Sequence, residues 1–100
     1  MNLEDKLSMW ENDDDVVHFV EFERRDLGDA FAVLYHVTMA STVPTYGRHL
    51  AIRVVVRKRD NEVLDWDMAN MNQGLRHELS WYKRGVEKYI KNKRESKNHY

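Results

Sequence analysis

Cysteine is absent from this 100-residue chain, and proline occurs only once. A chain without cysteine has no disulfide framework, no thiolate metal site and no nucleophilic thiol. No apolar run approaches the roughly 18 to 20 residues that a membrane-spanning helix requires. Acidic residues occupy the N-terminus, where a signal peptide would carry a basic region and then an apolar one. These absences predict a cytoplasmic protein that does not associate with a membrane.

The composition is that of a folded domain. Apolar residues make up 42% of the chain and charged residues 33%, which is too apolar for a disordered segment and too charged for a membrane one. The length is near the commonest domain size, and no linker or internal repeat divides the chain. We therefore predict one globular α+β domain over residues 1–95 and a frayed C-terminal tail at 96–100.

The periodicity of apolar residues predicts the order of the elements. The expected elements are a helix over 3–10, strands over 16–25, 30–39, 49–59 and 63–68, and a long helix from about 69 onward. Asn2 is the expected N-cap of the first helix. The predicted fold is α+β, with the order α-β-β-β-β-α. It is a four-stranded antiparallel β-meander with the long C-terminal helix packed on one face and the short N-terminal helix at the margin of that face.

Alternation within each strand predicts which side chains share the covered face. They are Val16, His18, Val20 and Phe22, then Phe31, Val33, Tyr35, Val37 and Met39, then Leu50, Ile52, Val54 and Val56, and finally Leu64, Trp66 and Met68. Hairpin loops at 26–29 and 60–62 fit this parity. The second loop places Arg57 opposite Asp65 and Val56 opposite Trp66. The long helix carries an apolar stripe that is expected to pack on this face, formed by Met71, Leu75, Leu79, Tyr82, Val86 and Ile90.

The sequence contains no catalytic or metal-binding motif. Five histidines occur, but none has a ligand spacing, and the four glycines stand alone rather than in a phosphate-binding loop. Asp65 and Asp67 alternate on one strand face, where Arg53 and Arg57 would hold both ionised. We therefore expect a protein that is not an enzyme and that has no cofactor and no metal.

Charge is distributed unevenly along the chain. Residues 1–30 carry a formal charge of −7, residues 31–60 carry +4, and residues 61–100 carry +2. Asp13, Asp14 and Asp15 concentrate the negative charge. They are either a solvated turn that ends the first helix or a mimic of phosphate charge for a basic partner surface.

Two further features suggest contacts with another protein. The connection 40–48 is the longest one predicted, and it carries Tyr46 and Arg48 beside the only proline. Trp81 falls beside Gly74 and Gly85 on a helical wheel, where a smooth patch would suit a partner. The alternative is that the N-terminal helix packs against this same strip.

A nucleic-acid interface is the alternative function. Residues 83–97 hold seven basic residues against two acidic ones, which suits contact with phosphates, although a solvated helix has the same pattern. The candidate residues for this interface are Arg53, Arg57, Arg59, Lys88, Lys91, Lys93 and Arg94.

In size and composition the chain resembles small α+β proteins of phages and mobile elements, a likeness that assigns no residue a role. We expect a non-catalytic protein-binding module, of the inhibitor or adaptor type, that acts on a larger cellular protein. The expected contacts are Asp13, Asp14, Asp15, Tyr46, Arg48 and Trp81. A homodimer through an open sheet face or an edge strand satisfies the same pattern.

Overall fold

The computed structural model describes residues 1–40, 48–71 and 74–97. Within these ranges the chain forms two helices and four strands. Their bounds are α1 Leu3–Glu11, β1 Val16–Asp26, β2 Ala30–Met39, β3 His49–Arg57, β4 Val63–Asn70 and α2 Leu75–Lys97. The order and type of the elements confirm the predicted α+β fold. The last helix begins later than its periodicity suggested, because β4 continues to Asn70.

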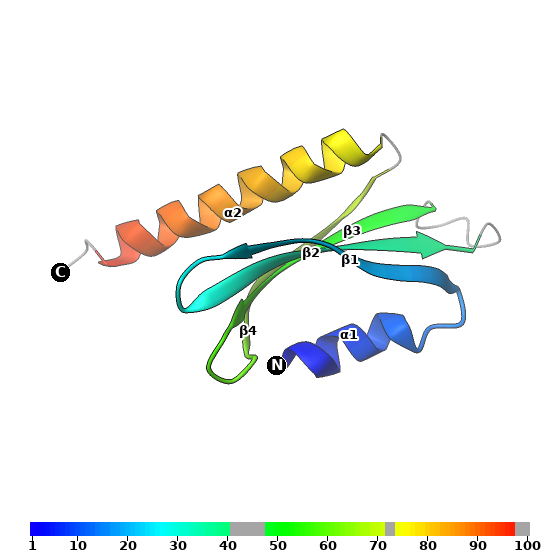
Figure 1. Cartoon of the computed structure of the whole chain (residues 1–100), viewed down its shortest axis with the longest axis horizontal. Helices are drawn as coiled ribbons and strands as arrows, with labels where there is room; N and C mark the ends of the chain where they lie inside the picture. The colour runs from blue at the N-terminus through cyan, green and yellow to red at the C-terminus, as the bar shows by residue number, and fades with distance from the viewer. Residues whose placement is uncertain (41–47, 72–73, 98–100) are drawn as a thin grey trace.

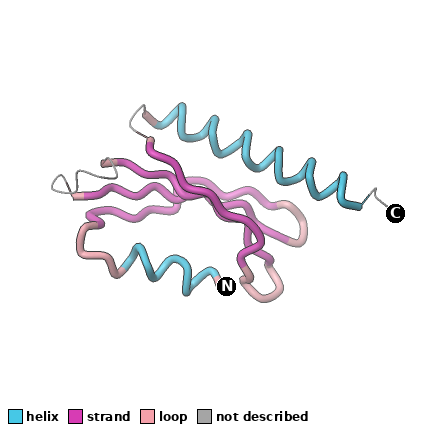
Figure 2. Tube along the Cα trace, turned by 180° about the vertical axis from the view of Figure 1, so that it is seen from behind, coloured by secondary structure: helices cyan, strands magenta, loops and turns pink. Residues whose placement is uncertain are grey.

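The strands form one antiparallel sheet in the order β1-β2-β3-β4, so sequence neighbours are also spatial neighbours. Figure 1 shows α2 on one side of this sheet and α1 on the other, and Figure 2 shows the same layers from behind. Asn2 caps α1 as predicted, since its side chain accepts a hydrogen bond from the Glu4 amide at 2.8 Å. Of the helices in the described ranges, none is long and apolar enough to cross a membrane.

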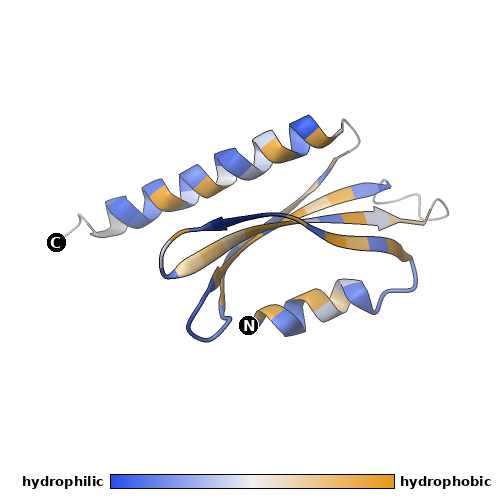
Figure 3. Ribbon diagram, viewed as in Figure 1, coloured by the Kyte–Doolittle hydropathy of each residue, from blue (hydrophilic) through white to orange (hydrophobic). Residues whose placement is uncertain are grey.

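Each helix covers its own face of the sheet, so the expectation that both lie on one face is wrong. The face under α2 contains Ala30, Ala32, Leu34, Ala51 and Val55. The face under α1 contains the larger residues, which are Val33, Tyr35, Val37, Met39, Leu50, Ile52 and Val54. In Figure 3 the middle strands are mainly hydrophobic, while hydrophobic and hydrophilic residues alternate along both helices. Because β2 and β3 are apolar on both faces, each face requires a covering layer.

Tyr82 anchors α2 to the sheet. Its side chain is 2% exposed, and its hydroxyl donates a hydrogen bond to the carbonyl oxygen of Ala32 at 2.6 Å. Burial raises the pKa of this hydroxyl to about 12. Val86, one turn further along α2, is also fully buried. The small side chains of Ala32 and Ala51 give the tyrosine ring the room it needs.

The predicted face assignment of β1 is wrong because the strand contains two irregularities in its pairing with β2. The register shifts between Val16 and His18 and again between Glu21 and Glu23. Each such bulge moves the following side chains to the opposite face. Phe19 therefore stacks on Tyr35 in the face under α1, with 5.2 Å between ring centroids.

The β3–β4 hairpin also differs from the predicted register. Trp66 lies opposite Val54 and Asp65 opposite Val55, with a shift between Val55 and Val56. The predicted pair of Arg57 with Asp65 is therefore absent. Arg57 instead donates a hydrogen bond to Asp60 within the turn, at 2.9 Å, and this bond lowers the pKa of the Asp60 carboxyl to about 2.

Candidate functional site

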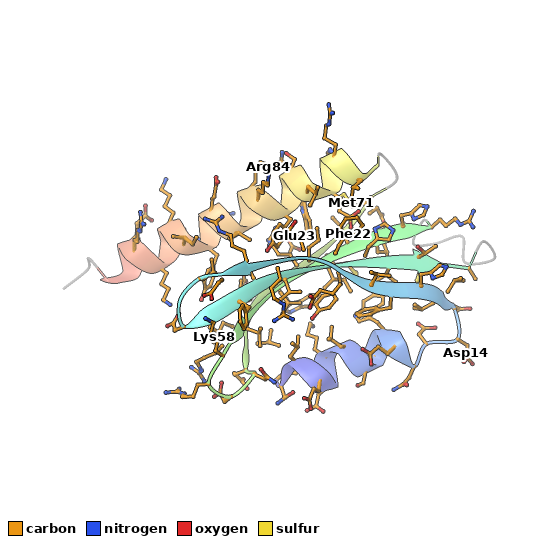
Figure 4. The ribbon with its side chains drawn as sticks, viewed as in Figure 1. Asp14, Phe22, Glu23, Lys58, Met71 and Arg84 are labelled. Carbon is orange, nitrogen blue, oxygen red and sulfur yellow. The ribbon has the colours of Figure 1, made fainter. Side chains whose placement is uncertain are left out.

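A hollow of about 270 Å³ opens between the sheet and the first turn of α2. Residues of β1, β2 and β3 contribute to its walls together with α2 and the segment before it. We call this hollow the histidine pocket, and its lining residues are Phe22, His36, His49, Met71, Gly74, Leu75 and Glu78. In Figure 4, Phe22 and Met71 lie in the layer between the sheet and α2.

Glu78 is the buried acid of the histidine pocket, with a side chain only 2% exposed. Its two carboxylate oxygens lie 2.9 and 2.8 Å from His36 Nδ1. On the other side of the ring, His36 Nε2 lies 3.2 Å from His49 Nδ1. A carboxylate is costly to bury without a partner, so His36 is the group that stabilises Glu78 in this position.

Strand register and helix position bring these three side chains together. His36 lies opposite Ala51, and His49 lies opposite Thr38, so the two histidines are diagonal neighbours on one face. Glu78 belongs to the first turn of α2, where the helix dipole favours a negative charge. Gly74 precedes α2 with φ of 101°, a conformation that glycine adopts without strain.

The contacts of His36 limit what the pocket can do chemically. One ring nitrogen faces Glu78 and the other faces His49, so binding a metal would require breaking one of these hydrogen bonds. Nowhere in the described ranges are three or more His, Asp or Glu side chains grouped so that they could hold a metal ion. The arrangement is that of an oriented, hydrogen-bonded polar floor beneath an apolar opening.

A second hollow, of about 650 Å³, runs along one flank of α2. We call it the α2 trough, and its lining residues are Leu75, Arg76, Leu79, Ser80, Lys83, Arg84 and Glu87. Leu75 and Leu79 form its apolar floor. A smaller hollow connects Lys83 and Glu87 to β1, so the trough lies on the side of α2 nearest that strand. The trough and the histidine pocket meet at Leu75, which is 47% exposed.

Three cations border the α2 trough. They are Arg76, Lys83 and Arg84, and in the part of the chain that the structure describes none of them forms an ion pair. The Arg84 guanidinium donates a hydrogen bond to Ser80 Oγ at 2.9 Å. Figure 4 places Arg84 on the outer side of α2, away from the sheet. The trough therefore combines an apolar floor with a rim of three cations and one carboxylate, Glu87, so its charge is positive overall.

Two apolar side chains of β1 extend this surface. Val20 lies directly opposite His36 and so belongs to the face of the sheet that α2 covers. The ring of Phe22 makes an edge contact with that of His36, at 6.3 Å between centroids. Both remain exposed, Phe22 by 41%, because α2 packs over the neighbouring strands. Apolar side chains left in water beside two hollows are typical of an interaction surface.

On the opposite flank of α2, Arg53 fills the space beside Trp81. The Arg53 side chain is 11% exposed, its guanidinium lies 4.7 Å from the centroid of the Trp81 ring, and it reaches Asp67 at 3.4 Å. A Cβ at Gly85 would collide with this guanidinium. Gly85 therefore has an intramolecular role, and α1, on the other face, does not pack against this strip.

Gly85→Ala is expected to change the free energy of unfolding by less than about 0.5 kcal/mol. Alanine favours a helix by about 1 kcal/mol over glycine, but its Cβ would displace Arg53 from Trp81 and lose a cation–π contact of similar size. With Arg53→Ala already present, Gly85→Ala should stabilise by about 1 kcal/mol. Urea denaturation of the four proteins measures both values. Equal stabilisation in both backgrounds would contradict this role of Gly85.

The predicted acidic contacts lie together at one end of the sheet. Asp13, Asp14 and Asp15 form an exposed turn between α1 and β1, and Figure 4 labels Asp14 there. The exposed Arg48 belongs to the same end, because its carbonyl oxygen accepts a hydrogen bond from the Met39 amide at 2.7 Å.

The other predicted contacts are not part of this group. Trp81 is partly buried under Arg53, on the far flank of α2 from the trough. Tyr46, with most of the 40–48 connection, lies outside the described residues.

Some of the residues proposed for nucleic acid have partners within the protein. Arg53 is nearly buried beside Asp67, and Arg57 is paired within the β3–β4 turn. Lys93 pairs with Asp29 at 3.3 Å. The exposed members are Arg59, Lys88, Lys91 and Arg94.

Sequence reasoning did not identify the two hollows as a site, although one signal was present. Glu78 falls on the apolar stripe of α2, between Leu75 and Tyr82, and a charged residue at such a position indicates a buried pair. Leu75 was predicted to be a core residue. It is exposed because it lies beside the pocket opening, in the first turn of the helix.

Comparison with protein-family models, with curated proteins and with solved structures finds no match to this chain.

Proposed function

We propose that this protein is a non-catalytic protein-binding module that holds a segment of a larger partner against the histidine pocket and the α2 trough. The observation that supports this most directly is the meeting of the two hollows at Leu75, beside the exposed ring of Phe22. Covering these apolar side chains would remove them from water, which is the main source of affinity in such contacts.

Other parts of the surface fit the same proposal. The acidic turn Asp13–Asp15 and Arg48 lie at the end of the sheet where His49 lines the pocket, so they would extend the contact area. Trp81 would form a separate contact on the other flank of α2. Action in the cytoplasm as an inhibitor or adaptor belongs to this proposal, and a cysteine-free chain is compatible with a reducing compartment.

Leu75→Ser is expected to weaken partner binding at least about tenfold, because truncating a central apolar contact typically has an effect of this size. Met9→Ser is the matched control, since Met9 is 62% exposed on α1, in the opposite layer. Both variants should melt at nearly the wild-type temperature. Tagged wild-type protein and the two variants are used to capture partners from a nuclease-treated lysate, and the captured protein is then titrated with each variant.

Equal binding by Leu75→Ser and the wild type would place the contact surface elsewhere. A parallel capture from untreated lysate tests the nucleic-acid alternative, which material bound there but lost on nuclease treatment would support. In that case, neutralising Lys88, Lys91 and Lys93 should reduce the dependence of affinity on salt.

A further inference from the structure

The α2 trough has the shape of the groove between two side-chain ridges of a helix. Side chains four residues apart form continuous rows along a helical surface. One row here is Leu75, Leu79, Lys83 and Glu87, and the next is Arg76, Ser80 and Arg84. The small side chain of Ser80 lies in the middle of the second row and keeps the groove open. In packed helices a groove of this kind receives a ridge of a second helix.

The charge of the trough rim specifies the partner further. Some cations of the protein pair with carboxylates, as Arg57 and Lys58 do at 2.9 and 2.8 Å. Within the described ranges Arg76, Lys83 and Arg84 form no ion pair. Glu87 is the one carboxylate in the lining of the trough, so positive charge remains in excess there. A partner that covers the apolar floor would exclude water from these cations. Attraction to a partner carboxylate, and repulsion of a partner cation, would then increase.

We propose, on the basis of the proposed function, that the bound segment is an amphipathic helix with acidic residues flanking its apolar stripe. Its apolar side chains would contact Leu75 and Leu79, and one of them would enter the histidine pocket beside Phe22. Arg76 and Lys83 are two helical turns apart, roughly 10 Å along the axis. The acidic residues of the partner would accordingly be spaced about two turns apart on the same flank.

Synthetic peptides test this chemistry directly. The first probe is a peptide of about 16 residues, long enough to be partly helical, with leucines at helical spacing and glutamates on the flanks. The second has lysine in place of each glutamate, and the third has the acidic composition in scrambled order. Titration into ¹⁵N-labelled protein should show shifts of the amides of α2 and of Phe22 with the first peptide. The other two should bind at least about tenfold more weakly.

Two matched variants locate the charge effect. Lys83→Glu reverses a cation of the trough rim and should weaken binding of the acidic peptide at least about tenfold. Lys88→Glu makes the same change on the other flank of α2, in the hollow that contains Arg53 and Gly85. It should change binding less than about threefold. Equal effects of the two reversals, or equal binding of the lysine peptide, would overturn the proposal.

Failure of this proposal can be distinguished from failure of the proposed function. If Leu75→Ser abolishes capture of the natural partner while the acidic peptide does not bind, the surface is correct and the acidic helix is wrong. If the acidic peptide binds at the trough but Leu75→Ser still captures the natural partner, the acidic helix is supported and the proposed partner site is wrong.

Discussion

Replacing Tyr82 by alanine is expected to lower the free energy of unfolding by about 4 kcal/mol, the usual cost of truncating a buried aromatic side chain. The Tyr82 ring lies between α2 and the sheet, where it packs in one cluster with Ala32 and Ala51. Its loss would leave a cavity and remove the hydrogen bond to the Ala32 carbonyl oxygen. Urea denaturation followed by circular dichroism measures the change. Hydrogen exchange should show that amides of α2 lose protection before those of β2 and β3.

Tyr82→Phe is the control that keeps the ring and removes only the hydroxyl. It should cost about 1 kcal/mol, the contribution of one hydrogen bond. If Tyr82→Ala costs no more than Tyr82→Phe, the ring does not anchor the helix and α2 is held by other contacts.

The free energy of unfolding of the wild type and that of Tyr82→Phe should also depend differently on high pH. An unfolded tyrosine ionises near pH 10, whereas burial raises the pKa of Tyr82 in the folded state to about 12. The unfolded chain then loses its proton first, so wild-type stability falls as the pH rises from about 10 to about 12. Below pH 10 both states keep the proton and the group contributes no pH dependence. Tyr82→Phe should show a smaller fall, since it lacks the contribution of Tyr82 and keeps that of Tyr35, whose pKa burial also raises.

The order of the elements could be predicted from the sequence because each strand and helix has a clear local period. Which face each helix covers could not be predicted from the large residues alone. In β2, Ala32 and Leu34 alternate with Val33 and Tyr35, so the strand is apolar on both faces. A continuous apolar run of this kind is typical of a strand buried on both sides. That signal predicts a covering layer on each face of the sheet, in place of two helices on one face.

The register of β1 could not be predicted because no residue in it marks a bulge. Neither Val17 nor Phe22 is a glycine or a proline, and the alternation of apolar residues continues through both positions. Tertiary packing decides the outcome: the bulges let Phe19 join the core under α1 while Phe22 faces the histidine pocket. The candidate site depends on this irregularity. The sequence pattern does not reveal the irregularity, so sequence analysis proposed other residues as the contact surface.

His36→Phe is expected to lower the free energy of unfolding by about 3 kcal/mol, because it leaves the buried carboxylate of Glu78 without its partner. Glu78→Leu should cost less, about 1 kcal/mol, since His36 is partly exposed and can bond to water. The double replacement puts an apolar pair in the same space and should be nearly neutral.

This double-mutant cycle separates stability from function at the histidine pocket. The two single changes should sum to a loss at least about 2 kcal/mol greater than that of the double variant, which would show direct coupling. Additive costs measured by urea denaturation would mean that His36 does not stabilise Glu78. A buried hydrogen-bonded pair that can be replaced without loss of stability is not needed for stability. The proposed function then requires the stable double variant to bind the partner more weakly, because its pocket has lost the polar floor. If the double variant is both stable and fully active in binding, the histidine pocket is not part of the contact surface, and the trough alone would have to account for it.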